Sequence, residues 1–160
     1  MRHGFIKTAA GTPKIQVADC VYNAGEILKL IRQMETEGAK IMAFPELCIT
    51  GYTCQDLFLQ ERLLEESLEG LQTVLEHTKG HDALTFVGLP FEKDGKLYNV
   101  AAAVQDGRIL GLVPKQNIPN YGEFYEVRHF AAGSREVSEG DVLGPVSYTH
   151  LRAHETRHDL

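Results

Sequence analysis

Two side chains of opposite charge stand at positions where a folded backbone would hold them firmly. Glu46 follows the apolar run at 39–44 (AKIMAF), which is typical of a strand buried on both faces. Lys115 follows a second apolar run, at 108–113, directly after Pro114. Because α/β sheets place ligand-binding groups at the carboxyl ends of strands, this carboxylate and ammonium could hold each other charged in a cleft. The ordinary alternative is a helix cap or a structural ion pair, and spacing alone does not separate the two.

Composition and charge narrow the classes of function. The chain has 160 residues, of which 43% are hydrophobic and 24% charged, a mixture typical of one globular domain. Its 16 basic and 22 acidic residues give a net charge of −6, which argues against a general binder of nucleic acid or anionic membranes. No apolar run approaches the roughly 20 residues that span a bilayer. The first residues show no secretory signal.

The three cysteines, Cys20, Cys48 and Cys54, are an odd number without the CxxC spacing of many metal sites. We therefore expect reduced thiols and a cytoplasmic protein. Cys48 lies two residues from Glu46, so contact between the two side chains is conceivable. Since cysteine is among the residues that are most often simply buried, we interpret all three as packing residues.

Hydrophobic periodicity and turn signals predict a layered α/β domain with a mixed sheet. A helix is predicted over 23–37, with Asn23 as the N-cap and Glu26 as its capping-box partner. A second helix is predicted over 61–79, with leucines along one side. Strands are predicted near 4–10, 39–44, 85–90, 97–104 and 108–113, with tight Asp-Gly turns at 94–95 and 106–107.

Two segments resemble the signatures of the nitrilase superfamily of carbon–nitrogen hydrolases. The first signature, a glutamate after a buried strand in an FPE turn, is matched by AKIMAFPELCITGY (39–52). The second, a lysine with a Pro-Asn-Tyr loop and a Glu-x-Arg-x-Phe ending, is matched by VPKQNIPNYGEFYEVRHF (113–130). The N-terminal glutaminase domain of glutamine-dependent NAD synthetases contains segments that are similar in sequence to PELCITGYTCQDLF and NYGEFYEVRHF. The resemblance covers about residues 1–135.

The resemblance implies a four-layer α-β-β-α sandwich, incomplete in this chain, and an active site that joins a glutamate, a lysine and a cysteine. Carried over, Glu46 is the general base that takes the thiol proton. Lys115 then stabilises the oxyanion of the tetrahedral intermediate. Glu126 matches a second glutamate that positions the lysine, and Tyr121 matches a residue that lines the substrate site. No metal is implied.

The family places its nucleophilic cysteine on a strand-to-helix turn well downstream of the lysine motif, and no segment of this chain resembles that turn. We therefore interpret residues 1–146 as a partial amidase (glutaminase) domain that is inactive alone. The resemblance implies glutamine as substrate, with ammonia passed to a synthetase domain of the same full-length chain for amidation of deamido-NAD. That domain would use ATP and Mg²⁺, whereas the glutaminase domain would need no cofactor. We also expect a homo-oligomer without nucleic-acid or membrane partners.

The last residues, 147–160 (SYTHLRAHETRHDL), hold three of the seven histidines and little apolar material. Their HETRH string (154–158) fits the H-E-x-x-H pattern of zinc proteases. A zinc site of that kind needs a third ligand and a helix packed on a core, and the string has neither an apolar stripe nor a following ligand. We interpret this tail as an out-of-frame or adapter-derived terminus.

Two other functions remain compatible with the residues. Another amidohydrolase of the nitrilase superfamily, acting on a different amide or carbamoyl compound, would carry the same pair of Glu46 and Lys115. A non-catalytic nitrilase-like interaction module would instead work through its oligomer interface. The sequence NYGEFYE favours the glutaminase over the other amidohydrolases.

Overall fold

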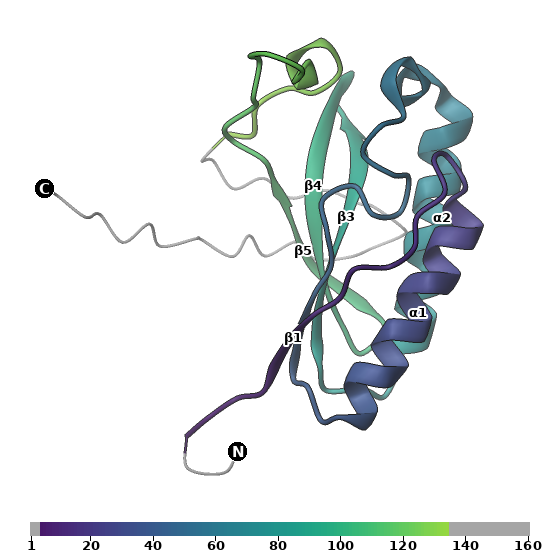
Figure 1. Ribbon diagram of the computed structural model, residues 1–160, viewed down its shortest axis with the longest axis vertical. Coiled ribbons are helices and arrows are strands. Elements are labelled where there is room, and N and C mark those ends of the chain that lie inside the picture. Colours follow the sequence, from purple (N-terminus) through teal and green to yellow (C-terminus); the bar gives the residue numbers. More distant parts are fainter. Residues whose placement is uncertain (1–3, 135–160) are drawn as a thin grey trace, which may run out of the picture.

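A computed structural model describes residues 4–134, which form one five-stranded sheet with two long helices on one of its faces (Figure 1). The strands are β1 (Thr8–Ala10), β2 (Ile41–Ala43), β3 (Leu84–Lys93), β4 (Lys96–Gln105) and β5 (Arg108–Pro114). They lie side by side in chain order. β1, β2 and β3 are parallel neighbours, whereas β4 is antiparallel to both β3 and β5. The tail at 147–160, with its H-E-x-x-H string, lies outside the described residues.

The predicted α/β class with a mixed sheet is confirmed. Helix α1 (Cys20–Thr36) connects β1 to β2, and helix α2 (Glu61–Thr78) connects β2 to β3, so the parallel part consists of two crossovers. The rest is a meander with two-residue turns at 94–95 and 106–107. The aspartate and the glycine have φ values of 52° and 69° in the first turn, and of 49° and 70° in the second. A type I′ turn requires positive φ at both positions, which explains the Asp-Gly pairs.

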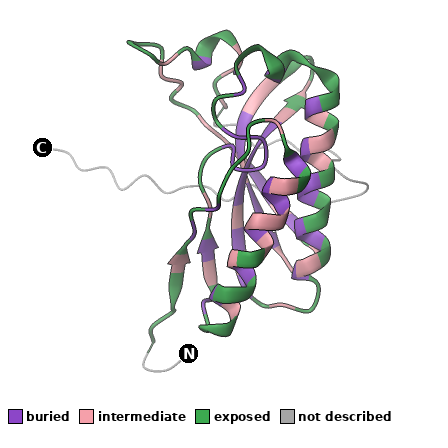
Figure 2. Cartoon of the chain, turned by 45° about the vertical axis from the view of Figure 1, so that its right-hand side comes forward, coloured by how far each residue is buried: buried purple, intermediate pink, exposed green. Residues whose placement is uncertain are grey.

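The core lies between the two helices and the sheet face that they cover (Figure 2). In the central strands the buried residues form consecutive runs, 87–90 in β3 and 102–104 in β4, so both faces of the sheet are partly removed from water. Each side chain that is removed from water in this way contributes about 1.5–3 kcal/mol, so this layer supplies most of the stabilisation of the domain. The most completely buried apolar side chains include Ile27, Ile31, Leu71 and Val74 of the helices and Met42, Val87, Leu89 and Val104 of the strands.

Helix α1 begins three residues before the predicted start, and the prediction that Asn23 caps it is wrong. The N-cap is Asp19, whose Oδ1 accepts a hydrogen bond from Tyr22 N at 2.9 Å. Asn23 is fully buried, and its Nδ2 donates to Gln16 O at 2.7 Å and to Ile49 O at 2.9 Å. Its Oδ1 accepts from Gln16 N at 2.8 Å. An amide can both donate and accept, so Asn23 joins two distant backbone segments.

Other boundaries agree more closely with the sequence pattern. The helix predicted over 61–79 is α2, and the strand predicted over 4–10 is present only as the shorter β1. Glu26, expected in a capping box, forms an ion pair with Lys29 instead, because the helix begins before Asn23. Between residues 4 and 134, neither helix is long and apolar enough to cross a bilayer.

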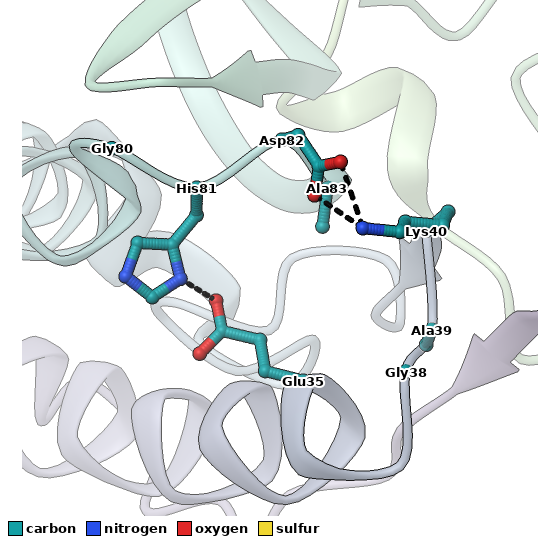
Figure 3. A pocket seen from close by; sticks show the side chains of 8 residues that line it. All are labelled: Glu35, Gly38, Ala39, Lys40, Gly80, His81, Asp82 and Ala83. Carbon is teal, nitrogen blue, oxygen red and sulfur yellow. Dashed lines mark hydrogen bonds and ion pairs between the residues drawn. The ribbon is translucent and has the colours of Figure 1, made fainter.

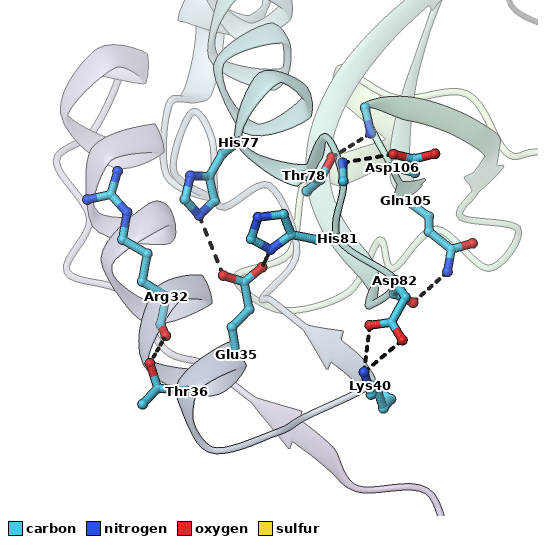
Figure 4. Close-up of polar contacts among 12 residues, drawn as sticks. Arg32, Glu35, Thr36, Lys40, His77, Thr78, His81, Asp82, Gln105 and Asp106 are labelled. Carbon is cyan, nitrogen blue, oxygen red and sulfur yellow. Dashed lines mark hydrogen bonds and ion pairs between the residues drawn. The ribbon is translucent and has the colours of Figure 1, made fainter. Parts of the chain in front are cut away.

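Charged side chains join the two helices at the end of the sheet where β2 and β3 begin (Figures 3 and 4). Glu35 Oε1 lies 2.5 Å from His81 Nδ1, and Glu35 Oε2 lies 3.7 Å from His77 Nε2. Lys40 Nζ contacts both oxygens of Asp82, at 2.6 and 2.7 Å. Glu35, Lys40, His81 and Asp82 line a hollow of about 300 Å³. Since they already pair with one another, we interpret this hollow as a structural junction.

Replacing the buried amide of Asn23 tests its structural role. Asn23→Leu leaves the buried carbonyl of Ile49 without its partner, so we expect the free energy of unfolding to fall by about 1–3 kcal/mol. Urea denaturation followed by circular dichroism measures this change. Asn117→Leu, at an exposed position, is the control and should change the free energy by less than about 0.5 kcal/mol. Equal losses in the two variants would contradict the role of Asn23.

Candidate active site

Glu46, Lys115 and Glu126 meet at the opposite end of the sheet, where β2 and β5 end. Lys115 Nζ lies 2.7 Å from Glu46 Oε1, and 3.0 and 2.9 Å from Oε1 and Oε2 of Glu126. The Glu126 side chain is 6% exposed, whereas those of Lys115 and Glu46 are 29% and 39% exposed. The ammonium therefore bridges a buried carboxylate and an accessible one. The structure brings together the three residues that the sequence singles out, and their catalytic roles stay predictions.

Glu46 reaches Lys115 because the chain after β2 folds over β3. Two strands separate β2 from β5 in the sheet, so at a spacing of about 4.8 Å their ends lie roughly 14 Å apart. A Cβ atom on Gly88 of β3 would lie 2.5 Å from Leu47 N and 2.6 Å from Pro45 O. Only glycine allows the backbone around Glu46 to pack this closely on the strand. Leu47 takes a φ of 51°, which a leucine rarely adopts, so the turn is also strained.

Two neutral side chains hold the carboxylates. Asn99, 4% exposed on β4, donates from Nδ2 to Glu46 Oε1, and its backbone oxygen accepts from Lys115 N at 2.8 Å. Tyr52 donates its hydroxyl hydrogen to Glu126 Oε1 at 2.7 Å. Neither residue is predicted from the sequence to belong to the site. The available signal for Asn99 was a polar residue within the apolar strand LYNVAAAV, and Tyr52 has the appearance of an ordinary core aromatic.

The surroundings of Lys115 favour its charged form. Burial works against the charge, but hydrogen bonds to Glu46 and Glu126 outweigh it and raise the pKa of Lys115 above its ordinary value. The pKa of Tyr52 is raised as well, first by burial and then by its hydrogen bond to Glu126. At neutral pH the cluster therefore contains a fixed cation and a neutral phenol donor.

The loop that carries Glu126 is anchored to the segment after the Glu46 turn. Arg128 Nε and Nη2 donate to the two oxygens of Asp56 at 2.9 and 3.0 Å, and His129 Nε2 lies 3.0 Å from Oδ1. Hydrogen bonds from Arg128 and His129 lower the pKa of Asp56 to about 2. Asp56 lies in the short 3₁₀ helix Gln55–Leu59, and Glu126 begins another, Glu126–Arg128. This contact joins the two halves of the site.

None of the three cysteines contacts the charged cluster in the described part of the chain. Cys48 Sγ points to Gly88 O, 3.6 Å away, and burial raises its pKa to about 11. Burial also raises the pKa of Cys20 to about 12, and it raises that of Cys54. A protonated thiol is a poor nucleophile, so these residues have the environment of packing cysteines.

Tyr121 is an exposed residue of the loop that carries Glu126. It is 71% exposed, and its ring packs edge-on against Phe124 with centroids 5.5 Å apart. Its expected role in lining the substrate site stays a prediction. A small hollow of about 50 Å³ lies beside the cluster, between Tyr52, Tyr125 and Glu126 among other residues.

Comparison with known proteins decides the family. The family model described as carbon-nitrogen hydrolase matches residues 7–148, a range that includes both signatures. The chain belongs to the carbon–nitrogen hydrolase family. It is 35% identical over 135 residues to the glutamine-dependent NAD(+) synthetase of Mycobacterium tuberculosis, covering 84% of this chain and 20% of that protein. The synthetase of Aquifex aeolicus is 38% identical over 117 residues, covering 73% and 20%. The chain thus spans about a fifth of the length of these relatives.

Solved structures agree with the family. A glutamine-dependent NAD(+) synthetase from Cytophaga hutchinsonii superposes with a TM-score of 0.82 at 31% identity, covering 89% of this chain and 24% of that one. An amidase from Nesterenkonia sp. has a TM-score of 0.70 at 18% identity, covering 89% and 53%, and so shares the fold. The resemblance stated from the two signatures is confirmed.

Gly88 offers a test of how the Glu46 turn is positioned. Gly88→Ala would force its Cβ into the backbone of residues 45–47, so we expect a loss of about 1–3 kcal/mol in the free energy of unfolding. The control is Gly25→Ala in α1, where a Cβ meets nothing within 4 Å. It should stabilise the protein by about 0.5–1 kcal/mol, because alanine is the better helix former. Thermal and urea unfolding distinguish the two outcomes, and a Gly88→Ala protein of wild-type stability would refute the close packing.

The raised pKa of Lys115 predicts a pH dependence. Its folded-state pKa exceeds the unfolded value of about 10.4, so its contribution to stability is complete below that pH and is lost as pH rises through the folded pKa. Glu126→Gln removes one partner and should lower the pKa of Lys115, as measured by NMR of its side chain. Glu123→Gln, an exposed carboxylate on the same loop, is the control and should leave that pKa unchanged. Equal shifts of the Lys115 pKa in both variants would show that this pKa depends on the net charge of the protein and not on contact with Glu126.

Proposed function

We propose that Glu46, Lys115 and Glu126 form the base and oxyanion-stabilising part of a glutaminase site, which hydrolyses the side-chain amide of glutamine. The observation that carries this proposal is an ammonium held between a buried carboxylate and an accessible one. The similarity to glutamine-dependent NAD(+) synthetases supports glutamine as the substrate.

In the proposed reaction, Glu46 takes the proton of a cysteine thiol, and the sulfur keeps the electron pair. The thiolate forms a bond to the carboxamide carbon while the C=O π pair moves to oxygen, where the ammonium of Lys115 stabilises the charge. The tetrahedral intermediate collapses, and ammonia leaves with the proton held by Glu46. Water, deprotonated by Glu46, then cleaves the thioester to give glutamate and the free thiol.

The nucleophilic thiol in this proposal belongs to a part of the protein beyond these 160 residues. Cys20, Cys48 and Cys54 are buried with raised pKa values, and the chain covers about a fifth of its synthetase relatives. The released ammonia would pass to a synthetase domain of the same full-length chain, which would use ATP and Mg²⁺ to amidate deamido-NAD. We further propose that the full-length protein is a homo-oligomer.

Ammonia release from glutamine tests the proposal in two proteins, the full-length product of the parent gene and the 160-residue chain. We expect turnover only by the longer protein, and a loss of at least about 100-fold in its Glu46→Gln and Lys115→Met variants. Cys48→Ala and the exposed-site control Glu65→Gln on α2 should keep most of the activity. Turnover by the 160-residue chain that Cys48→Ala abolishes would contradict the assignment of the nucleophile. Preference for another amide would identify a different amidohydrolase.

A further inference from the structure

The two oxygens of the Glu46 carboxylate have different surroundings. Oε1 accepts hydrogen bonds from Asn99 Nδ2 and from Lys115 Nζ, the latter at 2.7 Å. Within residues 4–134, Oε2 of Glu46 has no hydrogen-bond or ion-pair partner. The side chain is 39% exposed, so the carboxylate is partly accessible while one of its oxygens is held by two donors.

Asn99 is placed to produce this difference. It is 4% exposed within β4, and its neighbours Val100 and Tyr98 are paired with β3, so its backbone cannot shift freely. Its backbone oxygen accepts from Lys115 N at 2.8 Å, while its side-chain amide donates to Glu46. One residue thus sets the distance between the carboxylate and the strand end that carries the ammonium. Because an amide is neutral, it orients a carboxylate oxygen without adding a charge.

We propose that Asn99 is a positioning residue. Its hydrogen bond holds Oε1 of Glu46 in place, so that Oε2 is the oxygen that exchanges the proton. This inference rests on the proposed function and adds to it the oxygen that acts as base. In the first step the S–H bond of the thiol breaks, an O–H bond forms at Oε2, and sulfur keeps the electron pair. A proton arriving at Oε1 would have to displace a donor, the amide of Asn99 or the ammonium of Lys115.

The test uses the full-length protein, two substitutions of Asn99 and one control. Asn99→Leu removes the donor at similar volume, and Asn99→Asp puts a second carboxylate against Oε1. Gln72→Glu adds the same charge on the exposed face of α2. The other charged or titratable groups around Glu46, namely Lys115, Glu126 and Tyr52, stay unchanged in all three.

We expect Asn99→Leu to lower kcat for ammonia release by about 100-fold, the usual effect of a misplaced catalytic group, with little change in the KM for glutamine. In Asn99→Asp, two adjacent carboxylates share a proton, so the acidic limb of the kcat/KM profile should move up by about one pH unit or more. Gln72→Glu should change neither. A merely structural role would reduce the active fraction without moving that limb.

Two outcomes overturn the inference: an unchanged kcat in Asn99→Leu, or an acidic limb in Asn99→Asp that coincides with the wild type. If the wild type turns over glutamine and either result is found, the proposed function stands and the role of Asn99 falls. If glutamine is not a substrate, the same profiles are recorded with the best amide. If no amide is hydrolysed, NMR titration of Lys115 in the 160-residue chain decides. Asn99→Leu must then lower the pKa of Lys115, because Glu46 is no longer held against it.

Discussion

The rest of the structure depends on the ammonium of Lys115 between two carboxylates. Glu126 is almost completely buried, and a carboxylate in that position is costly unless a cation and hydrogen-bond donors compensate it. Lys115 and Tyr52 supply that compensation. Because Lys115 also contacts Glu46, the loop after β5 and the turn after β2 stay together as one unit. The same contacts keep Lys115 charged, which is the state that the proposed oxyanion stabilisation requires.

The sheet provides the two ends between which this contact forms. β2 and β5 run in the same direction but are not neighbours, so their ends cannot meet without a segment that crosses β3. Gly88 accommodates that crossing, and the strained φ of Leu47 is a consequence of it. At the other end of the sheet, the pairs of Glu35 with His81 and of Lys40 with Asp82 tie the helix ends to the starts of β2 and β3. The charged cluster and the structural junction therefore occupy opposite ends of the sheet.

Neutral hydrogen-bond donors and charged groups have different roles at the site. Asn99 and Tyr52 hold one oxygen of Glu46 and one of Glu126, and neither adds charge. Because both donors are neutral, they do not change the net charge of the cluster. That charge comes from the cation Lys115 and the two carboxylates, Glu46 and Glu126. The buried cysteines take no part in this balance, since each thiol packs against backbone or apolar neighbours.

The sequence by itself determined the helices, the Asp-Gly turns, the family, and the positions of Glu46 and Lys115 at strand ends, because these signals are local. Only the tertiary structure decided the partners of Asn23, Asn99 and Tyr52. Their hydrogen bonds reach across 26, 53 and 74 residues of chain, a separation that no periodicity encodes. A polar residue in an apolar run indicates that its side chain requires a hydrogen-bond partner. The identity of that partner depends on which strands become neighbours. The close packing on Gly88 has the same origin, since it exists only where two remote segments of backbone touch.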